Sequence, residues 1–147
     1  MLINFFKKLV PACLPEDIEE VALDLGHSDN KEECLRKTYD LLTKKYRGYR
    51  VKTYLRIFEL FTNDLEKIWK KNGFLHCTNL NYLMRVLLVK SGCFKDGDVR
   101  QRWTTVWFLS PHQYLRVKLG ENEFVNIDLW SHAYGIPFGK YAHGFNT

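Results

Sequence analysis

This chain contains, in this order, Cys77, His112 and Asp128, whose side chains can together carry out nucleophilic catalysis. Cys77 opens an apolar run, residues 78–91, whose pattern predicts a helix ended by Gly92. A thiol in the first turn of a helix is driven toward thiolate by the helix dipole and the unpaired N–H groups. His112 begins a strand-like stretch, and Asp128 closes the next one. A histidine within reach can take the thiol proton, and an acid can hold the imidazole ring and its tautomer. This order predicts a cysteine nucleophile.

The elements that must position the histidine and the acid are two strands. Residues 114–119 and 123–129 have strand-like patterns, and Gly120-Glu121-Asn122 between them is typical of a hairpin turn. Antiparallel pairing across that turn brings His112 and Asp128 together. Asp128 stands among apolar residues, where a carboxylate needs a partner because an unpaired buried charge is costly.

These residues resemble the transglutaminase-like core, which belongs to the papain-like cysteine-enzyme fold. The resemblance covers roughly residues 60–130 and lies in the order and spacing of the segments. It rests on Cys77 with its helix and Gly92, on His112-Gln113-Tyr114-Leu115-Arg116-Val117, and on Gly120 through Phe124-Val125-Asn126-Ile127-Asp128. Tyr114 and Val117 match the aromatic and branched residues expected after the histidine, and Phe124 the aromatic before the acid.

The resemblance implies acyl transfer through a Cys77, His112 and Asp128 triad, on protein or peptide amides. Water as the acceptor would make the chain a peptidase or amidase, which its compact length favours, and an amine would make it a transglutaminase. At Leu75, Gln113-Tyr114 and Leu129 the chain departs from the residues the family often has. A catalytically inactive interaction domain is therefore an alternative.

An acyl-transfer site also needs donors for the developing oxyanion. The backbone N–H of Cys77 is the natural first donor. Candidates for the second donor, or for a supporting role beside the nucleophile, are Asn72, His76, Asn79 and Gln113. His76 is a rival base, but adjacent helical residues do not face each other.

A zinc site is a further alternative, and its ligands would be His76, Cys77, His112 and His132. No pair among them has metal-like spacing. We therefore expect neither a metal nor an organic cofactor.

Length and composition favour one α+β domain spanning residues 1–147. Hydrophobic residues make up 46% of the chain and charged residues 27%, as in ordinary globular proteins. We expect helices over about 1–92, an antiparallel sheet over about 99–130, and an irregular tail at 131–147 that packs over the sheet.

The apolar runs are too short for a membrane span, so we expect no membrane partner. The apolar residues 1–10 contain lysines, and we interpret them as a buried first segment rather than a signal peptide. The cysteines form no C-x-x-C pair, and Cys13 and Cys34 look like small buried hydrophobes. A reducing, cytoplasmic location is the prediction; the oligomeric state is open.

The net charge of +5 is concentrated in one segment. Its basic residues are interleaved with tyrosines and are Lys44, Lys45, Arg47, Arg50, Lys52 and Arg56. A nucleic-acid-binding patch is one interpretation. We favour a solvated turn between helices, in which arginine stems cover apolar surface.

Local signals place the remaining elements. Pro15 and the acids after it predict a helix start, and Asp29 with Glu32 predicts a capping box for a helix to about Lys45. Another helical stretch is predicted from about Val51, and it restarts at residues 63–66. A strand is predicted at residues 103–109. Apolar residues of the helical stretch that are in helical register are Leu55, Phe58 and Phe61.

Overall fold

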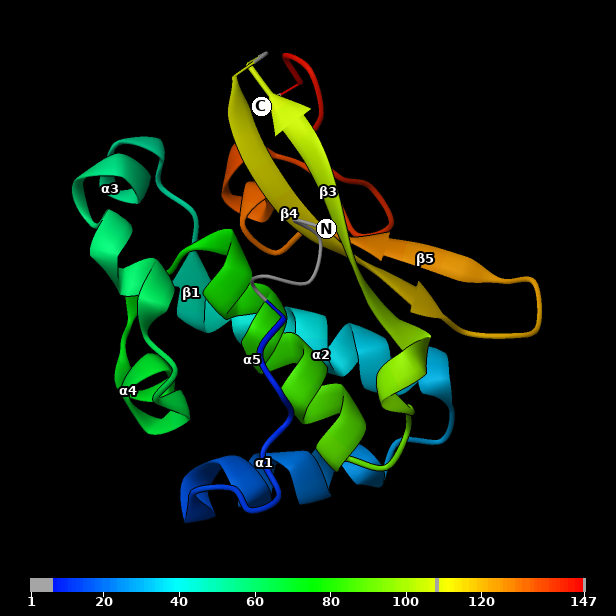
Figure 1. The fold of residues 1–147 in the computed structure, drawn as a ribbon. Helices are drawn as coiled ribbons and strands as arrows, with labels where there is room; N and C mark the ends of the chain where they lie inside the picture. The colour runs from blue at the N-terminus through cyan, green and yellow to red at the C-terminus, as the bar shows by residue number, and fades with distance from the viewer. Residues whose placement is uncertain (1–6, 108, 147) are drawn as a thin grey trace.

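The computed structural model describes residues 7–107 and 109–146, and it confirms a mixed α+β fold (Figure 1). Part of the predicted first segment, residues 1–6, lies outside the described residues. The helices are α1 (Glu16–Gly26), α2 (Lys31–Lys45), α3 (Arg50–Leu55), η2 (Ile57–Phe61), α4 (Leu65–Lys70), α5 (Cys77–Lys90), η3 (Asp96–Asp98) and η4 (Ser131–Tyr134). The strands are β1 (Tyr46–Arg47), β2 (Gly73–Phe74), β3 (Val99–Val106), β4 (Ser110–Lys118) and β5 (Phe124–Ile127).

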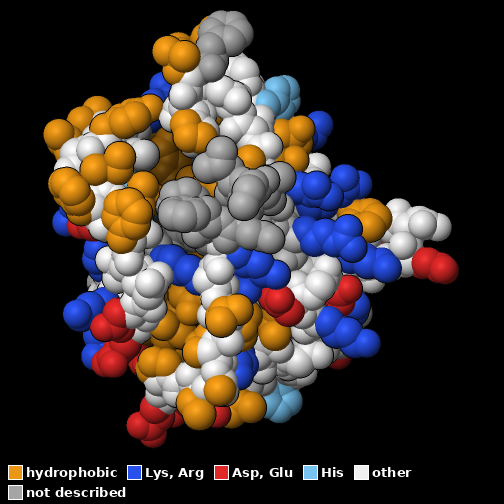
Figure 2. All heavy atoms as spheres, viewed as in Figure 1, with side chains coloured by type: hydrophobic (Ala, Val, Ile, Leu, Met, Phe, Trp, Pro, Cys, Tyr) orange, Lys and Arg blue, Asp and Glu red, His pale blue; other side chains and the backbone are white. Residues whose placement is uncertain are grey.

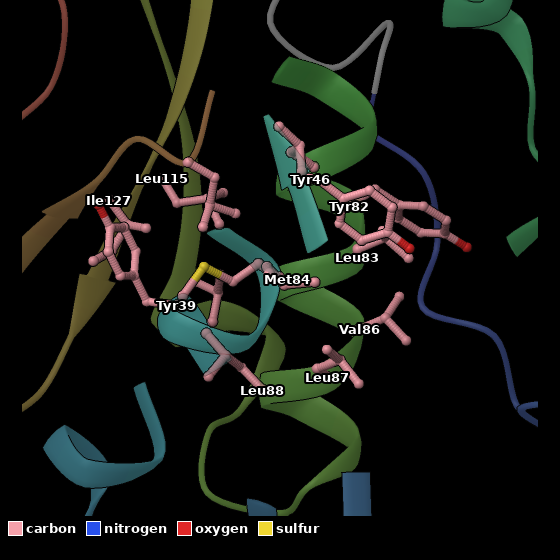
Figure 3. Packing of buried hydrophobic residues seen from close by; sticks show 14 of the residues in the cluster. Tyr39, Tyr46, Tyr82, Leu83, Met84, Val86, Leu87, Leu88, Leu115 and Ile127 are labelled. Carbon is pink, nitrogen blue, oxygen red and sulfur yellow. The ribbon is translucent and has the colours of Figure 1, made fainter. Parts of the chain in front are cut away.

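Helix α5 forms the centre of the core. Its side chains from Thr78 to Leu88 are all buried, and α1, α2 and β4 pack around it. Figure 3 shows Met84 pointing from α5 toward the sheet, on the side where Leu115 and Ile127 lie. Each fully buried side chain of this size is worth about 1.5–3 kcal/mol. The helix that carries Cys77 is therefore held rigidly.

The main sheet is antiparallel, in the order β3-β4-β5. The predicted hairpin is present, and the Leu119 N–H donates to the Glu123 carbonyl across the turn. The strand predicted at 103–109 is displaced, because β3 covers Val99–Val106. Trp107 has φ 53°, a left-handed conformation that ends the strand, and Phe108 lies outside the described residues.

The helix starts predicted at Pro15 and at residues 63–66 are correct. Helix α1 starts after Pro15, and Asp64 caps α4 by accepting from the Lys67 N–H. The predicted Asp29–Glu32 capping box is wrong by one position. Asn30 caps α2 by accepting from the Glu33 N–H at 2.9 Å, and Glu33 Oε2 accepts from the Asp29 N–H. Both pairs have capping residue types, so the pattern could not separate them.

A second sheet consists of β1 and β2, two residues each, paired in parallel with Tyr46 opposite Gly73. The Tyr46 hydroxyl donates to the Trp69 carbonyl at 2.5 Å. This pairing fixes the chain on either side of the α3–η2 segment and brings it beside the start of α5.

The apolar residues of α3 and η2 lie on the surface, and neither helix has a buried residue. Leu55 is 76% exposed and Phe58 84% exposed. The predicted helical stretch is present as the two short helices α3 and η2. The side chains of Leu55, Phe58 and Phe61 are exposed to solvent. Figure 2 shows the hydrophobic side chains gathered over this part of the molecule. We call this surface the apolar face, and its residues are Val51, Tyr54, Leu55, Ile57, Phe58 and Phe61.

Two expectations about the wider chain can be compared with the structure. Cys34 is buried as expected, but Cys13 is exposed, since it lies in the irregular segment before α1. Within the described residues, every helix is too short or too polar to span a membrane. After residue 130 the chain returns to the sheet, where Tyr141 is stacked on Tyr114 of β4.

Candidate active site

Cys77 is the first residue of α5, as the sequence predicts. His76 precedes the helix in an extended conformation, and no described side chain caps this end. The first N–H groups of an α-helix have no partner within the helix and form its positive end. The thiol therefore lies where negative charge is stabilised.

His112 and Asp128 form a direct pair. His112 Nε2 lies 2.8 Å from Asp128 Oδ2, and both side chains are buried. The β4–β5 register pairs Leu115 with Ile127, and continuing it places Asp128 opposite Tyr114. His112 is two residues from Tyr114 and thus projects to the same side of the strand. The pair is a diagonal neighbour contact across the hairpin.

The Asp128 carboxylate is fixed by the backbone of the tail. Oδ1 accepts from the Ser131 N–H at 3.1 Å, and Oδ2 accepts from the Ala142 N–H at 2.9 Å. The Ser131 hydroxyl also lies 3.4 Å from His112 Nε2. Asp128 is 2% exposed, and these hydrogen bonds satisfy a charge that would otherwise be costly to bury.

The protonated form of His112 is strongly favoured. Burial lowers the pKa of His112, but hydrogen bonds to Asp128 and to the Cys77 thiol outweigh it and raise the pKa to about 10. Since Nε2 faces Asp128, Nδ1 is the nitrogen left for Cys77. The imidazole thus binds the carboxylate directly and lies near the Cys77 thiol.

The ring of Trp130 covers the histidine. Its centroid lies 5.4 Å from that of His112. Gly48, just after β1, permits this packing, because a Cβ there would lie 2.4 Å from both the ring and the carbonyl oxygen of Trp130. No side chain larger than hydrogen fits this contact, so Gly48 sets the position of the indole.

An open cleft of about 210 Å³ gives access to the pair. Cys77 and His112 line it together with Arg50, Tyr54, Trp107 and Trp130. The Tyr54 hydroxyl donates to Ser110 Oγ at 3.0 Å, which joins α3 to the start of β4 across one wall. One flank of the cleft is therefore the same segment that bears the apolar face.

The other residues predicted for the site do not line this cleft. Asn72 is exposed at the turn before β2. Buried His76 lies 2.8 Å from the Arg56 carbonyl, and burial lowers its pKa. Asn79 donates to the Glu59 carbonyl and accepts from Lys8 Nζ at 2.7 Å. Both side chains tie the start of α5 to the α3–η2 segment, so they support the nucleophile indirectly.

Gln113 is joined to a residue that the sequence analysis missed. Asn81 Nδ2 donates to the Gln113 carbonyl at 2.9 Å and to its Oε1 at 3.2 Å. These bonds link α5, one turn after Cys77, to β4 beside His112. Gln113 Nε2 is buried without a partner among the described residues. The contact fixes the distance between the elements that carry the thiol and the imidazole.

The zinc alternative fails on geometry. His132 Nδ1 lies 2.9 Å from the Tyr39 hydroxyl, and His76 is bound to the Arg56 carbonyl. Within residues 7–107 and 109–146, no three histidine, cysteine or acidic side chains are grouped as metal ligands.

The basic segment divides into residues with different roles. Lys45 Nζ lies 3.8 Å from the Trp69 ring centroid, a contact of the kind predicted for a basic segment that covers apolar surface. Arg56 instead forms an ion pair with Glu59 at 3.1 Å. Arg50 departs from that prediction because it lines the cleft beside Cys77. Its place depends on the tertiary turn of the chain after β1.

No protein-family model matches the chain, and comparisons with curated proteins and with solved structures found no match. The function must therefore be argued from the site alone.

Proposed function

We propose that this protein is a cysteine-dependent acyl-transfer enzyme of the transglutaminase-like, papain-fold type. One observation carries the proposal: a buried imidazole binds Asp128 through Nε2, and it lines one cleft together with the Cys77 thiol at the start of α5. A purely structural histidine would not need a helix-terminal thiol on one side and an anchored carboxylate on the other.

In the proposed reaction, the Cys77 thiolate attacks the carbonyl carbon of an amide, and a tetrahedral oxyanion forms. His112 gives its proton to the departing amine, which leaves a thioester on Cys77. Water, or an amine, then attacks the thioester while His112 takes the proton of the attacking group. Collapse of the second intermediate releases the acid or the new amide and restores the thiolate.

Each remaining group has a defined part in this scheme. Asp128 orients the ring of His112 and stabilises the imidazolium without accepting its proton. The backbone N–H of Cys77 points from the positive end of α5 and serves as one oxyanion donor. No metal or organic cofactor enters any step.

The substrate is a polypeptide in this proposal. The apolar face flanks the cleft and shares Tyr54 with it, and contiguous exposed apolar residues are typical of surfaces that bind other chains. Hydrolysis is favoured over transfer to an amine, because the cleft is open to water. A reducing compartment such as the cytoplasm would keep Cys77 as a free thiol.

Trapping the acyl-enzyme tests the proposal. The protein is mixed with an activated acyl ester and its intact mass is followed, with peptide mapping to locate the acyl group. We expect one acyl group on Cys77, and none on that peptide in Cys77→Ala. Matched controls are Cys93→Ala, which removes a half-buried thiol, and Cys13→Ala, which removes an exposed one. Burial raises the pKa of Cys34 to about 11, so this thiol should stay unmodified.

His112→Gln separates catalysis from mere exposure of a thiol. In this variant acylation of Cys77 should fall by about 10²-fold or more, because both the proton transfer and the charge beside the sulfur are lost. Acylation of Cys13 that equals or exceeds that of Cys77 in the wild type would contradict the proposal and favour the inactive interaction domain.

A further inference from the structure

Arg50 occupies a wall of the cleft that also contains Cys77 and His112. It begins α3, and its side chain is half-buried. None of the described residues that line the cleft is an aspartate or a glutamate. Arg50 therefore adds a positive charge to a lining whose described residues include no carboxylate.

The Arg50 side chain is held in place by aromatic rings. Its guanidinium carbon lies 4.9 Å from the Trp107 ring centroid and 4.6 Å from that of Tyr134. The Tyr134 hydroxyl also accepts from the Arg50 backbone N–H at 2.9 Å. Trp107 presents its ring from a backbone with φ 53°, a conformation that costs of order 1–3 kcal/mol in a bulky residue. Strain of this kind persists where the surrounding structure fixes the backbone. Here the strained backbone of Trp107 places its ring against Arg50.

The hydrogen-bond donors of this guanidinium have no acceptor among the described residues. Other arginines differ: Arg85 binds Asp96 at 2.7 Å, and Arg36 binds Glu32 at 3.0 Å. Contact with ring faces leaves the in-plane N–H groups of an arginine available, and that fork matches both oxygens of a carboxylate.

We propose that Arg50 binds a carboxylate of the substrate next to the carbonyl that Cys77 attacks. This inference rests on the proposed function and gives it a substrate class: acyl donors with an acidic group close to the scissile amide. The carboxylate comes either from an acidic side chain or from the free C-terminus of a peptide, and the two share the same recognition chemistry.

The first test needs no turnover. Cys77 is alkylated with iodoacetate, which is an anion, and with iodoacetamide, its neutral analogue, and the modified peptide is quantified. The ratio of the two rates reports the local preference for an anion at the sulfur. Arg50→Gln should lower the ratio about fivefold or more, since a fixed positive charge in the wall of the same cleft is lost. Arg50→Lys should retain most of it.

Arg47→Gln is the matched control, because it removes an exposed positive charge three residues away that does not line the cleft. It should leave the ratio unchanged. In the wild type, the ratio should fall as salt is added, and this measurement needs no variant. An unchanged ratio in Arg50→Gln, or an equal fall in Arg47→Gln, would overturn the proposal. Because the ratio is defined for any accessible thiol, this result is separate from acylation by the activated ester.

The second test identifies the source of the carboxylate. Peptides with Asp or Glu flanking the scissile bond are compared with their Asn or Gln isosteres, and free C-termini with amidated ones. In the wild type, we expect kcat/KM to be at least tenfold lower for the uncharged member of one of these pairs than for the member with the carboxylate. In Arg50→Gln this preference should disappear. A wild type that cleaves neutral and acidic peptides equally would refute the assignment.

Discussion

Replacing Asp128 with Asn tests the reasoning about the buried pair. The carboxylate accepts hydrogen bonds from His112, Ser131 and Ala142. An asparagine has one oxygen, so its NH2 group must face either the Ser131 N–H or both the imidazole and the Ala142 N–H, which share Oδ2 in the wild type. In either orientation at least one donor loses its acceptor. Removing one partner of a buried charged pair typically costs about 3–5 kcal/mol.

At roughly 2–4 °C per kcal/mol for a chain of this size, Tm should fall by roughly 6–20 °C. The size of the fall should depend on pH in a defined direction. In the folded protein the pKa of His112 is raised to about 10 from an ordinary value of 6.5. Its contribution to stability is therefore fully present below about pH 6.5 and is lost as the pH rises through about 10.

Asp128→Asn removes the charged carboxylate, the partner that does most to raise the pKa of His112, so the variant should lack most of this pH dependence. The difference in unfolding free energy between wild type and variant should be largest near pH 6 and should narrow toward pH 10. A pKa change of one unit corresponds to about 1.4 kcal/mol. We therefore expect the difference in unfolding free energy to shrink by at least about 1.4 kcal/mol between pH 6 and pH 10.

The assay is urea denaturation at several pH values between about 6 and 10, with comparison at each pH so that titrations common to both proteins cancel. Asp40→Asn on the exposed side of α2 is the control, and it should change neither stability nor its pH dependence. If Asp128→Asn lowers stability by the same amount at every pH, the pair does not hold a proton on His112 and the reasoning is wrong.

Three other predictions follow from the site. Gly48→Ala should destabilise the protein by about 1–3 kcal/mol or more in thermal unfolding and slow acylation, because its Cβ would displace Trp130. His112→Gln should slow alkylation of Cys77 by iodoacetamide at pH 6 more than at pH 9, as followed by peptide mapping; equal slowing would argue against an ion pair. Arg47→Glu should change turnover of a small neutral ester by less than about twofold, since this side chain does not line the cleft.

The parts of the fold that sequence could predict are those decided by local chemistry. Pro15 and the acids after it start a helix, because proline suits the first turn and acids suit its positive end. The turn between β4 and β5 is short, so its length fixes which residues pair. Counting outward from that turn places His112 beside Asp128 without any knowledge of the rest of the chain.

The parts that sequence could not predict depend on contacts between distant segments. The β1–β2 pair is two residues long, too short to leave a pattern. The hydrogen bond from the Ala142 backbone N–H to Asp128 cannot be predicted from the sequence, because almost any residue type has a backbone N–H. The position of Arg50 in the cleft follows from the course of the chain after β1, while its sequence neighbours only indicate a basic surface.

The apolar face shows why a periodic pattern can predict a helix and still mislead about its environment. Residues in helical register normally mark the side that packs against the core. Here α3 and η2 are short, and their apolar side chains lie on the surface beside the cleft. The pattern cannot distinguish apolar surface that is covered by the chain itself from apolar surface kept for another molecule.

The polar residues of α5 carry a signal that the sequence does contain. Cys77, Asn81 and Arg85 are spaced four residues apart in a largely apolar helix, so they lie along one side of it. Asn81 binds the backbone of β4 next to the histidine, and Arg85 binds Asp96 ahead of β3. Buried polar groups must be paired, so each of them fixes the helix against the segment it meets. This polar stripe sets the position of α5 along the sheet, and hence the approach of the Cys77 thiol to His112.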